Sequence, residues 1–245
     1  MAKSTPRLFV DQPLQPRAEI TLAVEQAHYL GGVLRLVAGD AVAVFNGADG
    51  EYLAHVAEAA KKKMVLRLEK QTNVVKPPAD IDYLFAPLKH SRLDYLVQKA
   101  TELGARRLRP VITARTIAER VNLDRMKANV VEAVEQCNQV YVPDVLAPVS
   151  LNAALRDWQA GRALIYCDET AEQGNAVAAL FKLKTPAAIL VGPEGGFTTE
   201  ERAMLKALPY VTAISLGPRI MRADTAAVAI LALVQAVLGD WDKKS

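Results

Sequence analysis

Cysteine and histidine are scarce in this chain: its 245 residues include two cysteines and three histidines. Cys137 and Cys167 are too few for a disulfide framework, and no histidine stands at metal-ligand spacing from another histidine or from a cysteine. The sequence therefore predicts no metal site. Two lone cysteines favour a reduced, cytoplasmic protein in which both thiols are small core residues.

A long hydrophobic stretch is also missing. The longest apolar run without a charge covers residues 225–239, which is 15 residues and includes Gln235. Because a membrane span needs about 20 apolar residues, we interpret this run as a buried helix. The chain does not open on a basic segment followed by an apolar one, which is the pattern of a signal peptide. These features predict a soluble protein.

Glycine and proline, at 13 residues each, are too few for a collagen-like or low-complexity chain, and 51% hydrophobic residues are too many for a disordered one. The net charge of +3 is unevenly distributed. Residues 1–72 contain nine Lys and Arg against eight Asp and Glu, whereas residues 86–127 contain ten against four. Such a local excess indicates either a surface that faces a polyanion or a solvated helical face.

The first 70 residues read mostly as short strands separated by turn residues. Strands are expected at 8–10, 18–22, 41–45, 52–57 and 64–68, and one helical stretch at 25–36. Many short strands in so small a segment indicate a small barrel or sandwich. The Lys76-Pro77-Pro78 stretch predicts a linker, because proline lacks an amide hydrogen and restrains the residue before it. We therefore expect one domain at 1–72 and a second at 73–245.

The second domain alternates between strands and amphipathic helices, which is typical of a mostly parallel α/β sheet covered on both faces. Strands are expected at 81–86, 108–113, 163–167, 187–191 and 211–216. Helices are expected at 91–103, 123–139, 198–208 and from about 224 onward. Ser91 is predicted to cap the first of these helices, and Gly104 to end it.

Two loops in this domain each follow an apolar strand and precede a helix. The first is Gly192-Pro193-Glu194-Gly195-Gly196-Phe197, and the second covers residues 216–226. Ligands of open α/β sheets bind at the carboxyl ends of strands, where glycine lets the backbone come close to them. Neither loop is a Walker A loop or a dinucleotide-binding fingerprint. The pattern alone leaves open whether the glycines serve a ligand or only a turn.

The two loops together resemble the SPOUT methyltransferases, and within them the enzymes that methylate N3 of a uridine in 16S rRNA. The similar positions of the second loop are Leu216-Gly217, Arg219-Ile220, Arg222 and Thr225-Ala226. The resemblance covers almost the whole chain and extends to Arg7-Leu8-Phe9, His28-Tyr29-Leu30, Val33-Leu34-Arg35, Gly39-Asp40, Ala86-Pro87-Leu88-Lys89 and the segments 98–104 and 132–136. The chain departs from the family at Cys137-Asn138-Gln139 and at Asp224, where the family usually has glutamate.

This resemblance implies a PUA-like, RNA-binding β-barrel at 1–72 and a SPOUT α/β domain with a deep trefoil knot at 73–245. It also implies a homodimer that uses S-adenosylmethionine to methylate N3 of a specific uridine in 16S rRNA of the small ribosomal subunit. A SPOUT enzyme that acts on tRNA or on another rRNA base is one alternative. A non-catalytic RNA-binding module is the other, although such a module has no need of both loops.

The resemblance also assigns roles to residues. Arg222 is the first catalytic candidate, because a guanidinium can stabilise the negative charge that develops on uracil as N3 loses its proton. Glu194 is the second, as a base or as a partner of the cofactor amine, while a structural ion pair of Arg222 with Glu194 or Asp224 is the alternative. The implied cofactor-binding positions are Leu190, Gly192, Gly195, Leu216, Gly217, Ile220, Met221, Thr225 and Ala226. The predicted RNA contacts are Arg7, Arg35, Lys89 and Arg115.

Overall fold

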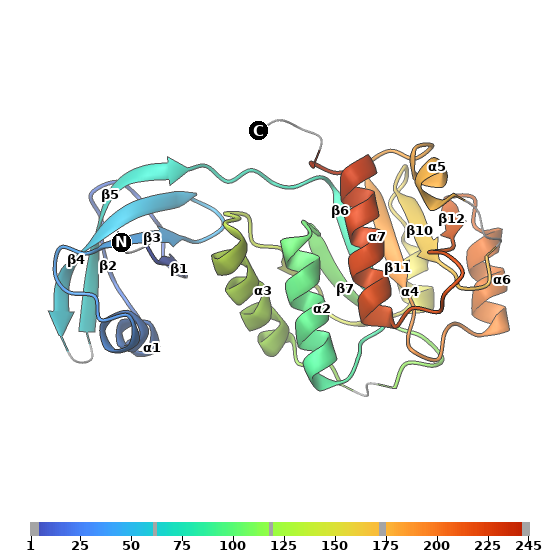
Figure 1. Cartoon of the computed structure of the whole chain (residues 1–245), viewed down its shortest axis with the longest axis horizontal. Helices are drawn as coiled ribbons and strands as arrows, with labels where there is room; N and C mark the ends of the chain where they lie inside the picture. Colours follow the sequence, from blue (N-terminus) through green and yellow to red (C-terminus); the bar gives the residue numbers. More distant parts are fainter. Residues whose placement is uncertain (1–4, 61–62, 118–119, 172–174, 242–245) are drawn as a thin grey trace. The chain divides into compact units, whose positions relative to one another are not determined.

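The computed structural model describes residues 5–60, 63–117, 120–171 and 175–241, and the chain forms two compact units in it (Figure 1). Unit 1 comprises the chain up to Lys76 together with Val134–Val142. Unit 2 comprises Pro77–Ala133 and the chain from Pro143 onward. The division at residues 76 and 77 falls inside the proline-containing stretch, whereas the return of residues 134–142 to unit 1 has no signal in the sequence.

The strands of unit 1 form one five-stranded sheet in the order β1-β3-β4-β5-β2, in which only β1 and β3 pair in parallel. The strands are β1 (Arg7–Phe9), β2 (Glu19–Thr21), β3 (Ala41–Phe45), β4 (Glu51–Ala60) and β5 (Lys63–Asn73). Alternate residues such as Val42 and Val44 are buried in the core of the unit. β4 and β5 run longer than their apolar patterns predict, because their outer halves continue to pair through the backbone while their side chains are exposed.

The helix expected at 25–36 is shorter and changes character along its length. α1 (Val24–His28) continues as η1 (Tyr29–Val33), a π-helical turn that contains Gly31 and Gly32. Glycine disfavours a regular helix, and a Cβ at Gly32 would lie only 3.0 Å from the ring of His28. The chain then leaves the helix at Arg35, whose φ of 57° no right-handed helix contains.

Arg7 joins the sheet of unit 1 to the end of α3 (Leu123–Cys137). Its Nε pairs with Oε2 of Glu51 at 2.7 Å. Its two terminal nitrogens donate at 2.7–3.0 Å to the carbonyl oxygens of Val134, Glu135 and Gln139. Carbonyls at a helix end lack partners within the helix, and a cation there also complements the helix dipole. The guanidinium predicted to contact RNA is thus engaged inside the protein, with only 12% of its side chain exposed.

Replacing Arg7 by methionine is expected to lower the free energy of unfolding by about 3–5 kcal/mol, because Glu51 then stays buried without its cation. Burial opposes the ionisation of Glu51, but hydrogen bonds from Arg7, Asn73 and Thr72 outweigh it and hold the pKa of Glu51 below its ordinary value of 4.5. The stabilisation is therefore present above pH 4.5 and is lost as the pH falls through the lower folded-state pKa. Urea unfolding of both proteins at pH 7 and pH 3 measures this difference.

Arg67 provides the control for this experiment, since its ion pair with Glu19 is exposed. Replacing Arg67 by methionine is expected to cost less than about 1 kcal/mol. Equal losses for the two variants at pH 7, or an Arg7 loss that does not shrink in acid, would contradict the role assigned to Arg7.

Unit 2 is built on one parallel sheet in the order β12-β10-β11-β6-β7-β8, with β9 paired to β7. The strands are β6 (Ile81–Phe85), β7 (Arg107–Ile112), β8 (Asp144–Val145), β9 (Val149–Ser150), β10 (Ala163–Cys167), β11 (Ala187–Val191) and β12 (Val211–Ile214). Every residue of β6 and β11 is buried. Strands covered on both faces read as continuous apolar runs, and for this reason the predicted bounds of β10 and β11 are confirmed.

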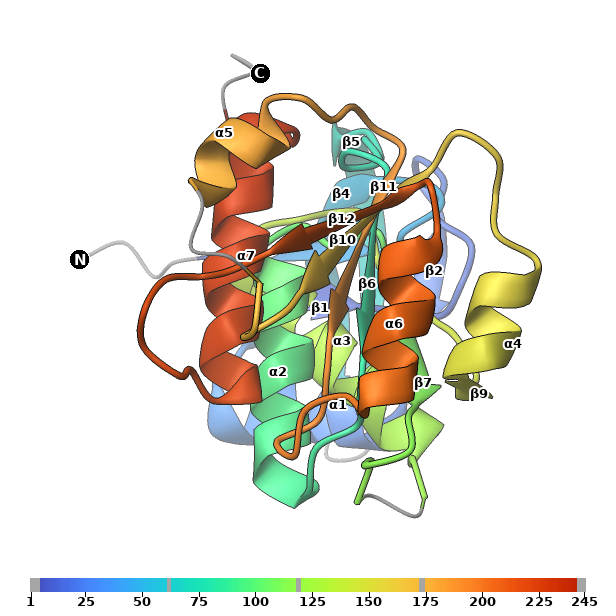
Figure 2. The same cartoon turned by 90° about the vertical axis from the view of Figure 1, so that its right-hand side faces the viewer.

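Helices cover both faces of this sheet, as predicted. They are α2 (His90–Glu102), α3, α4 (Leu151–Arg156), α5 (Ala176–Leu180), α6 (Thr199–Ala207) and α7 (Ala223–Val237). Figure 2 shows α2 and α7 on one face and α4 and α6 on the other. The apolar run at 225–239 lies mostly in α7, whose buried residues pack inside unit 2. Within the described ranges, no helix is long and apolar enough to cross a membrane.

Two helix starts differ in how well the sequence predicts them. At α6, the hydroxyl of Thr198 accepts from the amide of Glu201 at 3.2 Å, and the Glu201 carboxylate accepts from the Thr198 amide at 2.9 Å. The predicted cap of α2 at Ser91 is wrong: Lys89 already has the extended backbone of an N-cap residue, and no side chain caps this end. The predicted end at Gly104 is confirmed by its φ of 73°.

Candidate active site

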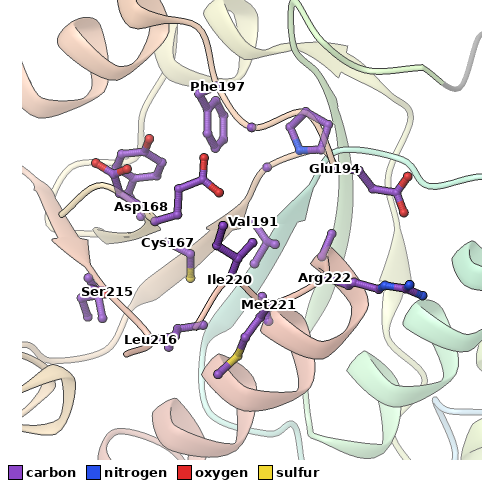
Figure 3. Close-up of a pocket in the computed structure, with 18 of the residues that line it drawn as sticks. Cys167, Asp168, Val191, Glu194, Phe197, Ser215, Leu216, Ile220, Met221 and Arg222 are labelled. Carbon is purple, nitrogen blue, oxygen red and sulfur yellow. The ribbon is translucent and has the colours of Figure 1, made fainter. Parts of the chain in front are cut away.

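Three loops of unit 2 follow neighbouring strands at one edge of the sheet. Residues 168–171 follow β10, residues 192–197 follow β11 and residues 215–222 follow β12. Because these strands are adjacent and parallel, their carboxyl ends meet at the same edge. A cavity of about 740 Å³ lies among the loops (Figure 3), and its size is in the range of small-molecule sites.

Most of the residues predicted from the two loops line this cavity. They are Gly192, Glu194, Leu216, Gly217, Ile220, Met221, Arg222 and Ala226. Leu190, Gly195 and Thr225 are not among the lining residues. Leu190 is fully buried in β11, the exposed Gly195 accepts a hydrogen bond from Arg115 through its carbonyl oxygen, and Thr225 is exposed in the first turn of α7.

Glycine is required at two points of the lining. Gly217 has a φ of 106°, which is a strained conformation for any other residue, and a Cβ there would point into open space. At Gly192 the reason is contact, because a Cβ would lie 2.4 Å from the ring of Phe197. The first glycine thus leaves room beside the backbone of the loop, and the second lets an aromatic ring close over it.

Aromatic side chains form one wall of the cavity. The ring of Phe197 meets Tyr166 edge-on at a centroid distance of 5.1 Å. The hydroxyl oxygen of Tyr166 is buried, and it has no hydrogen-bond partner within the described part of the chain. Cys167 lines the cavity next to it, and burial raises the pKa of its thiol to about 12. This thiol is protonated at neutral pH and is a poor nucleophile.

Charged side chains from the end of β10 stand beside this wall. Asp168 pairs with Arg202 at 3.2 Å and with Lys206 at 2.7 Å. Burial opposes its ionisation, but Lys206 and the N–H and O–H groups of Thr170 outweigh this and lower the pKa of Asp168. Glu169 is half exposed and accepts from Arg202 at 2.8 Å. This side of the cavity therefore carries two carboxylates that are paired with two cations, Arg202 and Lys206.

The opposite side of the cavity carries Arg222 and Glu194, whose side chains extend in the same direction in Figure 3. The two do not pair with each other. Glu194 is bound instead by the guanidinium of Arg92 from α2, and Nε of Arg92 lies 3.3 Å from a carboxylate oxygen of Asp224. Among the described residues, no hydrogen bond or ion pair engages the guanidinium of Arg222, which is exposed at the N-cap of α7. The structural ion pair that stood as the alternative for Arg222 is thus made by Arg92.

The remaining residues predicted to contact RNA are exposed. Arg35 lies in unit 1 just after η1, and Lys89 is the N-cap of α2. Arg115, in the loop after β7, donates to the carbonyl oxygen of Gly195 at 2.8 Å and so braces the glycine-rich loop. The carboxylate of Glu201 in α6 also supports the loop after β7, because it accepts a hydrogen bond from the amide of Ala114 at 2.8 Å.

Sequence reasoning missed a large share of the lining residues. They are Arg92, Tyr166, Cys167, Asp168, Glu169, Phe197, Arg202 and Ser215. Asp168 and Glu169 had a usable signal, because an acidic pair directly follows a buried strand at the edge where the loops 192–197 and 216–226 lie. Arg92 had none, since its α-helical position says nothing about which loops lie opposite.

Comparison with known proteins decides the family. The model of an RNA methyltransferase domain matches residues 75–235, and the model of an RNA methyltransferase PUA domain matches residues 22–69. The chain belongs to the RNA methyltransferase family. Similar proteins named ribosomal RNA small subunit methyltransferase E occur in Rickettsia conorii, with 30% identity over 94% of both chains, and in Synechocystis, with 32% identity over 95% of this chain and 78% of that one.

Solved structures of this family share the architecture of both units. A Legionella pneumophila protein described as a methyltransferase, solved with bound S-adenosylmethionine, is 28% identical and covers 96% of this chain and 99% of its own, with a TM-score of 0.83. The ribosomal RNA small subunit methyltransferase E of Neisseria gonorrhoeae, also bound to S-adenosylmethionine, is 25% identical with the same TM-score, over 97% and 99% of the two chains. The expected fold, a PUA-like domain followed by a SPOUT-like parallel sheet, is confirmed. The protein is a methyltransferase, as predicted.

Proposed function

We propose that this protein transfers the methyl group of S-adenosylmethionine to N3 of a uridine in 16S rRNA of the small ribosomal subunit. The observation that carries the proposal is the guanidinium of Arg222, which has no ion-pair or hydrogen-bond partner among the described residues and stands at the cavity between the loops after β10, β11 and β12. The names of the relatives support a small-subunit rRNA substrate, and the two similar solved structures support the cofactor.

The cavity fits this cofactor in shape and in chemistry. The open space beside Gly217 lets the backbone of the loop approach a ligand, and the apolar wall at Phe197 suits an adenine ring. Glu169 would accept hydrogen bonds from the ribose hydroxyls or from the amino group. Backbone groups of residues 192 and 216–221 would hold the rest.

S-Adenosylmethionine supplies a methyl group on a positively charged sulfur. Uracil N3 attacks the methyl carbon as the carbon–sulfur bond breaks, but N3 carries a proton and is a poor nucleophile until that proton leaves. Arg222 would stabilise the negative charge that spreads over the ring as the proton departs. Glu194 would accept the proton, and to do so its carboxylate has to loosen its contact with Arg92.

RNA recognition is assigned to both parts of the chain. We place a PUA-like RNA-binding domain at residues 1–72, with the exposed Arg35 as a phosphate contact, and a methyltransferase domain at 73–245. Lys89 and Arg115 would meet phosphates in the methyltransferase domain. Guanidinium and ammonium groups bind phosphate without regard to sequence, so these contacts position the RNA and do not choose the base.

A homodimer is the second part of the proposal. α7 presents a face of small apolar residues, which lines a hollow of about 680 Å³ with the exposed Trp241. The residues of this face are Ala229, Ala232, Leu233 and Ala236. A face without charges fits the same face of a second copy. Light scattering should therefore give twice the chain mass of 26.6 kDa, and a monomer would contradict the proposal.

Methyl transfer to ribosomal RNA can be tested directly. The purified protein is incubated with S-adenosylmethionine labelled in its methyl group and with small subunits, naked 16S rRNA or tRNA from a strain that lacks the protein. Digestion to nucleosides and mass spectrometry should find 3-methyluridine in 16S rRNA. Label in tRNA, or in another nucleoside, would favour a different substrate, and no transfer to any RNA would favour a binding module.

A further inference from the structure

We propose that Arg92 is a positioning residue that keeps the guanidinium of Arg222 free for the substrate. The inference rests on the proposed function, in which Arg222 stabilises charge on the uracil ring. Arg92 is the only cation whose ion pairs to Glu194 and Asp224 are observed among the described residues. It would act through Arg222 and would not touch the reacting atoms.

Arg92 connects three segments that are far apart in the chain. It stands near the start of α2, Glu194 belongs to the loop after β11, and Asp224 lies in the first turn of α7. The Arg92 side chain is 31% exposed and that of Asp224 is 18% exposed. The Glu194 side chain is 45% exposed, so its pair with Arg92 is screened by solvent, whereas the pair with Asp224 is partly buried and is screened less. The pair therefore favours one arrangement of the loop and the helix start.

Without Arg92, Arg222 would be available as a partner for both carboxylates. Asp224 is two residues from Arg222 in the chain, and Figure 3 shows Glu194 and Arg222 on the same side of the cavity. If Arg222 formed an ion pair with either carboxylate, that ion pair would have to break before its guanidinium could bind the uracil ring. Arg92 thus neutralises the two carboxylates and leaves Arg222 for the substrate.

The experiment compares the wild type with R92M, R92K and the double variant R92M/D224N. R125M is the matched control, because Arg125 forms an ion pair from α3 to Asp94 of α2 and is exposed. Three quantities are measured: the labelling of Arg222 by phenylglyoxal in the cofactor-free protein, read by mass spectrometry, the affinity for S-adenosylmethionine, and the single-turnover rate of methylation. Melting temperatures are recorded on the same preparations.

Phenylglyoxal should label Arg222 readily in the wild type, several times more slowly in R92M, and at an intermediate rate in R92M/D224N, where Glu194 remains as a partner. The single-turnover rate of R92M should fall about tenfold or more with cofactor affinity nearly unchanged, since misplacement of a catalytic group costs rate. The double variant should recover part of that rate, R92K should lie between R92M and the wild type, and R125M should match the wild type.

Two outcomes would overturn the inference. In one, R92M keeps the wild-type rate and the wild-type labelling of Arg222. In the other, R92M loses rate, cofactor affinity and melting temperature together, and the second substitution restores none of them, which identifies Arg92 as a structural staple. If the wild type itself transfers no methyl group, the proposed function fails, while the labelling of Arg222 still decides what Arg92 does.

Discussion

Replacing Arg222 by alanine is expected to lower the single-turnover rate of methyl transfer by about 100–1,000-fold, the usual loss on removing one preorganised donor of charge stabilisation. The guanidinium has no ion-pair partner in the described structure, so its removal breaks no contact that supports the fold. Melting temperature and cofactor affinity should therefore stay close to the wild type. An interaction that is stronger in the transition state than in the ground state affects rate more than binding.

Two further variants sharpen this test. Arg222→Lys keeps the charge but loses the planar fork of donors, so its rate should also fall. Arg219→Ala removes an exposed guanidinium from the same loop and should have a much smaller effect on the single-turnover rate. A near-normal rate for Arg222→Ala would remove this residue from the catalytic assignment and leave Glu194 as the next one to test.

Replacing Gly217 by valine is expected to abolish binding of S-adenosylmethionine. The Cβ and its two methyl groups would occupy the open space beside the loop, where the cofactor backbone contacts are proposed. The φ of 106° also strains any side-chain-bearing residue, at a cost of about 1–3 kcal/mol in stability. Isothermal calorimetry at concentrations that saturate the wild type should then detect no heat of binding.

A valine at Gly161 distinguishes the effect of backbone strain from the effect of a side chain that fills the cofactor cavity. Gly161 has a φ of 80° with no atom within 4 Å of an added Cβ, and it is not among the residues that line the cavity. Gly161→Val should therefore lose a similar amount of stability but keep its cofactor affinity. If both valine variants bind the cofactor normally, the loop at Gly217 is only a turn.

The Arg7 and Arg92 results show why charged residues are hard to assign from a sequence. The charge pattern of the sequence around each arginine is like that of many solvent-exposed segments, and Arg7 was predicted to bind RNA. In the structure each guanidinium is shared among groups that come from distant parts of the chain. The spacing of residues in the sequence does not distinguish an arginine with such distant partners from an arginine that is free.

The sequence by itself determined the strands and helices that carry the site, because local patterns record burial. β10 and β11 are continuous apolar runs since both faces of a parallel sheet are covered, and the glycine-rich loop after β11 and the Gly217 loop after β12 stand out against them. The motifs in those loops also indicated the family. The long helix α7 was found because its uncharged apolar run also records burial, whereas the short α4 and α5 carry too few residues for a periodic signal.

Only the tertiary structure decided which groups meet. Residues 134–142 belong to unit 1 because Arg7 binds the carbonyl oxygens at the end of α3. Arg92 forms the ion pairs with Glu194 and Asp224 that the sequence had suggested for Arg222. Tyr166, Asp168 and Glu169 line the cavity although none of them belongs to the loop motifs. The trefoil knot stays a prediction. Ion pairs and cavity walls join residues that the sheet topology brings together, and a local pattern of hydrophobicity contains no information about partners a hundred residues away.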